Sequence, residues 1–131
     1  MSRCVYLLLV MATGGTKFGT AFCPATRLSQ LRRSVKSNYR AAGLRHFYSL
    51  EFSGHGHMHA ARHAEILLRE ACTEPSGSFA GCMDYTPDAP AIVLEHLNNA
   101  VQIFMAAGLS SSCVRKLGWR DNRRKDRAYP H

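Results

Sequence analysis

The feature of the chain that most restricts its fold is an unbroken apolar run near its start. Residues 5–12 carry no charge, and a Thr-Gly-Gly turn signal follows directly at residues 13–15. A run of this kind that ends in a turn is typical of a fully buried strand. Residues 17–22 then alternate in character, so we predict an antiparallel hairpin closed by the glycines. A short secretory signal peptide is the alternative interpretation, although a single cation, Arg3, precedes the run.

Farther along the chain, apolar residues recur at helical spacing in three segments. A helix that starts near residue 25 would bury Leu28 and Leu31 and expose a basic outer face. Residues 58–72 form a second strongly patterned helix. A third helix is expected to begin with Asp88 as its N-cap and to run to about residue 107.

One long segment and one short segment between these helices read as strands. Residues 44–52 alternate, which places His46 and Tyr48 on the same face of the predicted sheet. A short strand is expected near residues 78–83, and a loop through Tyr39 precedes the third strand.

These elements predict the α+β fold class, with a small antiparallel three-stranded sheet flanked by helices in the order ββα-β-α-(β)-α. The length of 131 residues suits one domain. We therefore expect a domain at residues 1–108, followed by a basic and flexible tail at residues 109–131.

Charge is segregated along the chain, whose net charge is +8 with the histidines neutral. Residues 1–50 contain lysines and arginines but no acid. The charged residues within 51–114 are mostly acidic, and those within 115–131 are mostly basic again. Such segregation predicts a positive face, whose commonest partner is phosphate, with a merely solvated basic surface as the alternative. We expect the nucleic-acid backbone to contact five cations: Arg32, Arg33, Lys36, Arg40 and Arg45.

Two short motifs and two later residues resemble a known family. They are Cys-Val-Tyr at residues 4–6, Lys-Phe-Gly at residues 17–19, Arg27 eight residues beyond that glycine, and Glu65 on the helix after the third strand. In order and spacing they resemble the GIY-YIG endonucleases, most closely a phage and prokaryotic branch of DNA-binding, nuclease-like proteins. The resemblance covers residues 4–72 and implies a metal-dependent endonuclease that hydrolyses phosphodiester bonds in DNA, with RNA as the open alternative.

The resemblance also implies a role for each matched residue. Tyr6 would position or deprotonate water, and Lys17 would supply a neighbouring cation. Arg27 would grip the phosphate oxygens, and Glu65 would bind one divalent metal ion, Mg²⁺ being the best match. The chain departs from the family where Cys4 and Lys17 replace glycine and tyrosine. A nucleic-acid-binding module of the same fold that does not cut is therefore the alternative.

Each of these residues also has a purely structural interpretation. Tyr6 would then be a strand former, Lys17 an exposed strand cation and Arg27 a surface charge. Glu65 would pair with an arginine at helical spacing.

A second metal hypothesis comes from a histidine-rich segment. The segment contains His55, His57, His59 and His63. Together with Glu65 or Cys72, these histidines could bind zinc. The alternative is that they simply form the polar start of a helix.

The cysteines and the apolar runs bear on the compartment of the protein. Five cysteines without a Cys-x-x-Cys pair argue against a disulfide framework and favour free thiols in a reducing, cytoplasmic environment. No apolar run is long enough to cross a membrane, so we expect no membrane partner.

Overall fold

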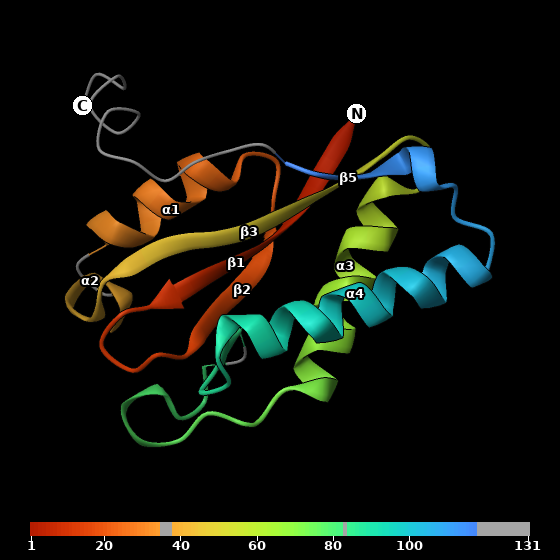
Figure 1. Cartoon of the computed structure of the whole chain (residues 1–131). Helices are drawn as coiled ribbons and strands as arrows, with labels where there is room; N and C mark the ends of the chain where they lie inside the picture. Colours follow the sequence, from red (N-terminus) through yellow and green to blue (C-terminus); the bar gives the residue numbers. More distant parts are fainter. Residues whose placement is uncertain (35–37, 83, 118–131) are drawn as a thin grey trace.

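The computed structural model describes residues 1–34, 38–82 and 84–117. It is an α+β fold with one five-stranded antiparallel sheet in the order β4-β2-β1-β3-β5 (Figure 1). The strands are β1 (Ser2–Val10), β2 (Thr16–Ala21), β3 (Leu44–Ser53), β4 (Tyr85–Thr86) and β5 (Val114–Lys116). The helices are α1 (Pro24–Arg33), α2 (Asn38–Ala42), α3 (His57–Ala71) and α4 (Pro90–Ala106), with short 3₁₀ turns η1 (Gly77–Phe79) and η2 (Ser111–Cys113).

The apolar run forms the central strand, as its pattern predicts. Val5, Leu7 and Leu8 on β1 are completely buried, because helices cover both faces of the sheet at this strand (Figure 1). The turn to β2 uses Gly14 in the left-handed region, at φ 75°, and the Val10 amide donates to the Gly15 carbonyl at 2.9 Å. The predicted hairpin is therefore confirmed.

The expectation of three strands is wrong, because two short strands extend the sheet. β4 pairs with β2 and β5 pairs with β3. Strands of two or three residues are too short to show a period in the sequence. Among the described residues 78–82, the strand expected near residues 78–83 is not formed, since residues 77–79 make the turn η1. β5 lies within the segment expected to be a tail, and residues 118–131 lie outside the described residues.

Two further local expectations are corrected. The segment around Tyr39, expected to be a loop, forms the short helix α2, and Tyr39 packs into the core. Asp88 does not cap α4, whose N-cap is Ala89. Instead, Asp88 Oδ2 accepts from the Thr73 amide at 2.9 Å and ties the end of α3 to the start of α4.

A bulge in β3 changes which way its side chains face. Tyr48 lies opposite Leu7 whereas His46 lies opposite Leu8, so Phe47 is the extra residue. Neighbouring residues of a strand face opposite sides, so His46 and Tyr48 lie on different faces of the sheet. The expectation that they share a face is therefore wrong.

Within the described residues, no helix combines the length and the apolar character needed to cross a bilayer.

Candidate functional site

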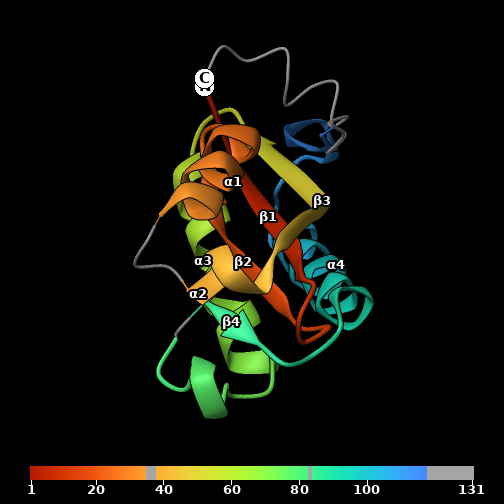
Figure 2. The ribbon, with the colours of Figure 1, turned by 90° about the vertical axis from the view of Figure 1, so that its left-hand side faces the viewer.

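The two faces of the sheet carry different layers. On one face, α3 and α4 cover Val5 and Leu7 with an apolar core. On the other face, α1 and α2 cover Tyr6 and Leu8, and β4 closes the edge of this layer. Figure 2 shows α2 beside β4, where the Tyr39 and Tyr85 rings are 6.4 Å apart. We call these the α3/α4 face and the α1/α2 face.

Lys17 is buried at the edge of the α1/α2 face. Its side chain is 2% exposed, and Nζ donates to the Phe18 carbonyl at 2.9 Å and to the Asp84 carboxylate. Nζ also lies 5.5 Å from the centroid of the Tyr6 ring and 5.8 Å from that of Tyr39. The pKa of the Tyr39 phenol is raised above its usual value, mainly by burial and secondly by the negative charge of Asp84. Tyr39 therefore stays neutral beside the ion pair.

Tyr6 and Lys17, two of the four residues that resemble nuclease residues, thus lie together. The Tyr6 hydroxyl also packs against the backbone of β2, since a Cβ built on Gly19 would lie 2.6 Å from that oxygen. A glycine at this position makes room for the tyrosine. Because Tyr6 is itself only 2% exposed, a polymeric phosphodiester reaches its hydroxyl only if this layer opens.

Arg27 lies on α1 and lines a hollow of about 360 Å³ at the edge of the sheet. Arg3 lines the same hollow, with its Nε donating to Thr20 Oγ1 at 3.4 Å and its guanidinium 4.6 Å from the centroid of the Phe22 ring. Two arginines therefore border one open hollow, and guanidinium groups are well suited to bind an anion.

Glu65 lies on α3, which packs on the other side of the sheet from Tyr6 and Lys17. Its Oε1 lies 3.5 Å from Nη2 of Arg69, so the pairing at helical spacing is present. Tyr6 therefore lies beside Lys17, and Arg27 and Arg3 line the same hollow. Glu65 lies on the opposite face of the sheet from Tyr6 and Lys17.

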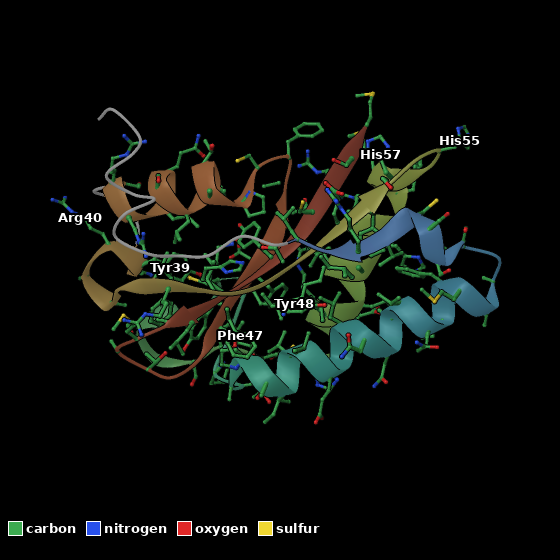
Figure 3. All side chains as sticks on the ribbon, turned by 45° about the horizontal axis from the view of Figure 1, so that its top comes forward. Tyr39, Arg40, Phe47, Tyr48, His55 and His57 are labelled. Carbon is green, nitrogen blue, oxygen red and sulfur yellow. The ribbon has the colours of Figure 1, made fainter. Side chains whose placement is uncertain are left out.

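The predicted phosphate-contacting cations are spread over three elements. Arg32 donates to the Leu44 carbonyl at 2.7 Å, and Arg33 donates to the Ser29 carbonyl at 3.3 Å. Arg40 projects from α2 into solvent (Figure 3). Arg45 lies opposite Leu9 and so belongs to the α3/α4 face. Lys36 lies outside the described residues.

The histidine-rich segment lies far from the tyrosine layer. Figure 3 places His55 and His57 at the opposite end of the sheet from Tyr39. His57 Nδ1 is 2.9 Å from the Gly54 carbonyl, and the His63 ring packs 5.2 Å from that of Phe104. In the described part of the chain, these histidines do not form a three-ligand group.

The structure also brings together three side chains of types that can bind a metal, and the sequence patterns did not predict this group. Cys72, Asp88 and His96 bring a thiol sulfur, a carboxylate oxygen and a ring nitrogen within 4.8 Å of one another. Burial, and next the charge of Asp88, raise the pKa of the Cys72 thiol to about 11. The three residues follow no known metal-ligand spacing, so only their proximity in the fold reveals them.

Comparison with protein-family models, curated proteins and solved structures finds no match to this chain. The resemblance to GIY-YIG endonucleases therefore rests on the sequence motifs alone.

Proposed function

We propose that the protein binds nucleic acid, with DNA as the first choice, through a basic face made of Arg27, Arg33 and Arg40 on α1 and α2, together with Arg3 on the adjoining end of β1. The observation that carries the proposal is the absence of acidic partners. Within the described residues, no carboxylate forms an ion pair with any of the four, whereas Lys17, Arg69 and Arg115 each pair with one. Guanidinium groups without carboxylate partners are well suited to bind phosphate oxygens.

The distribution of acids supports the same surface. α1 and α2 contain no acidic residue, whereas α3 and α4 carry Glu65, Glu70 and Glu95. A phosphate backbone is therefore attracted more strongly to the α1/α2 side, where no acid of these helices offsets the arginines. The hollow beside Arg27 and Arg3 supports the proposal, because two arginines there could contact one phosphate group.

A fluorescence anisotropy titration of labelled duplex DNA tests the proposal. We expect the Arg33→Gln/Arg40→Gln variant to bind at least about tenfold more weakly and to lower the slope of log K against log[salt] by about 2. The matched control is Arg62→Gln, an exposed arginine on α3, which should change affinity less than threefold. Equal losses of DNA affinity in both variants, or an affinity that does not change with salt concentration, would contradict the proposal.

Cleavage is the second candidate function, as a metal-dependent endonuclease of the GIY-YIG type with Tyr6, Lys17, Arg27 and Glu65 as its site and Mg²⁺ held by Glu65. It is favoured by the position of Arg27 beside an open hollow and by the contact between Tyr6 and Lys17. The buried Tyr6 and the distant Glu65 favour the binding function instead, because hydrolysis needs both groups at one phosphate.

Nicking of supercoiled plasmid, with Mg²⁺ or with EDTA, separates the two functions. A nuclease should lose cleavage but little binding in Glu65→Ala, while Glu70→Ala, an exposed acid on the same helix, should remain active. Binding without metal-dependent nicking would leave the protein as a binding module.

A further inference from the structure

Three ligand-bearing residues meet where the end of α3 approaches α4. Cys72 is the C-cap of α3, Asp88 precedes α4, and His96 lies on α4. Their sulfur, oxygen and nitrogen atoms lie within 4.8 Å of one another, and all three residues are at least partly buried. This group lies apart from the basic face, since α3 and α4 cover the opposite face of the sheet.

The backbone around Asp88 is held by a chain of hydrogen bonds. Thr16 Oγ1 donates to the Asp88 carbonyl at 2.8 Å, and the Asp88 amide donates to Thr86 Oγ1 at 3.2 Å. Thr86 Oγ1 in turn donates to the Thr73 carbonyl at 2.8 Å, next to Cys72 in sequence. The Thr73 amide donates a hydrogen bond to Asp88 Oδ2. A carboxylate has about four acceptor positions, so Asp88 can still bind a cation. The carboxylate of Asp88 and the backbone that follows Cys72 are therefore held close to each other before any metal binds.

We propose that Cys72, Asp88 and His96 bind one zinc-like divalent metal ion. Thiolate, imidazole and carboxylate are the ligands that Zn²⁺ prefers in proteins. Metal–ligand bonds of about 2.0–2.3 Å at tetrahedral angles place ligand atoms roughly 3.2–3.7 Å apart. The present separations, none of them above 4.8 Å, would have to shorten to that range by side-chain rotation when the metal binds. On binding, a sulfur–metal bond replaces the thiol proton, which passes to the solvent.

One of the three residues, Cys72, borders an open space. Cys72 lines a hollow of about 310 Å³, together with Arg69, Glu74 and Tyr85. Three protein ligands with one position left for water is the arrangement of an accessible zinc site rather than of a closed structural site. This site does not depend on the proposed nucleic-acid binding, and its test uses no nucleic acid.

The test uses the full chain, stripped of metal by a chelator and titrated with Zn²⁺ in competition with a chromogenic chelator. Co²⁺ serves as the spectroscopic probe. We expect one equivalent of Zn²⁺ to bind, and we expect Co²⁺ to show thiolate charge-transfer absorption with the strong visible bands of four-coordinate cobalt. Cys72→Ser and His96→Ala should each weaken Zn²⁺ binding roughly tenfold or more.

Two matched controls separate this site from its neighbours. Cys82→Ser removes another thiol that lines the same hollow, and His59→Ala removes an exposed histidine of the histidine-rich segment. Both should bind Zn²⁺ as the parent does. Circular dichroism verifies the fold of each metal-free variant, and the Co²⁺ spectrum of the parent needs no substitution. A parent protein that takes up no stoichiometric Zn²⁺, or shows no thiolate band with Co²⁺, overturns the proposal, as does binding that follows His59 instead of Cys72.

Discussion

The two faces of the sheet use the same central strand in opposite ways. From β1, Val5 and Leu7 enter a core on the α3/α4 face that is built almost entirely from aliphatic and phenylalanine side chains. Tyr6 and Leu8, their neighbours in sequence, enter a layer that contains tyrosines and a buried lysine. The core of one face is therefore stabilised mainly by apolar burial, whereas the other must also hold a charged group out of reach of water.

This difference has a consequence for what each face can tolerate. An apolar core loses stability in proportion to the volume that a substitution removes. A layer with a buried charge depends on the group that pairs with this charge. Removing one partner leaves the other buried and unpaired, which is costly. Three arginines of the basic face, Arg27, Arg33 and Arg40, lie on the helices that cover the second layer, so the polar interior and most of the cationic exterior share α1 and α2.

The largest effect should come from the apolar face. Leu97 on α4 is completely buried, so Leu97→Ala should lower the free energy of unfolding by roughly 2–5 kcal/mol in urea denaturation. Ile103→Ala, on the exposed side of the same helix, should change it by no more than about 0.5 kcal/mol. Similar losses in the two variants would show that α4 does not pack as described.

The ion pair of the other face should respond asymmetrically. Asp84→Ala leaves the Lys17 ammonium buried without its carboxylate and should cost roughly 3 kcal/mol of unfolding free energy. Lys17→Met keeps the apolar stem and leaves Asp84, 37% exposed, to be solvated by water, so it should cost about 1 kcal/mol or less. The double variant should be more stable than Asp84→Ala alone. A larger loss in Lys17→Met than in Asp84→Ala would show that the buried ammonium of Lys17 does not need the Asp84 carboxylate.

The contact between β1 and β2 on the same face offers a steric test. Gly19→Ala should cost roughly 1–3 kcal/mol, because the new methyl group meets the Tyr6 hydroxyl at 2.6 Å and Cζ at 2.9 Å. In a Tyr6→Phe background the hydroxyl is gone, so the same substitution should cost clearly less. A double-mutant cycle from urea midpoints measures this coupling, and purely additive losses would place the two residues apart.

The smallest effect concerns pH. Burial, and next the negative charge of Glu51, raise the pKa of the Cys4 thiol to about 11. The folded protein therefore keeps a proton that the unfolded chain loses near pH ~8.5, so this stabilisation is complete below that pH and is lost as the pH rises toward 11. Between pH 8 and 10 the loss should reach about 1–2 kcal/mol.

The matched comparison for this pH effect is between two cysteines. Cys4→Ala should flatten the decline of the urea midpoint with pH, whereas Cys82→Ala, which removes a half-buried thiol elsewhere in the fold, should leave it unchanged. An unchanged slope in Cys4→Ala would mean that other groups cause the alkaline loss.

Much of the fold could be predicted from local patterns. The apolar run at residues 5–12, the helical spacing of Leu28 and Leu31, and the alternation from residue 44 each repeat over enough residues to indicate an element. The bulge at Phe47 could not be predicted, because one extra residue reverses the facing of its neighbours without altering the composition.

The candidate site was less predictable than the fold. The motifs that contain Tyr6 and Lys17 indicated that the two lie on neighbouring strands, and they do. That both are buried, and that Lys17 pairs with Asp84, depends on a loop 67 residues away in sequence. Motif spacing carries no information about such a distant partner.

By itself, the sequence determined the central hairpin, the helices α1, α3 and α4, and the concentration of cations in the first 50 residues. These features follow from local periodicity and composition, which act between neighbours in the chain. Tertiary structure alone decided the edge strands β4 and β5, the separation of Glu65 from Tyr6, and the meeting of Cys72, Asp88 and His96. The physical reason is that these arrangements depend on contacts between distant segments, which form only when helices pack on both faces of one sheet.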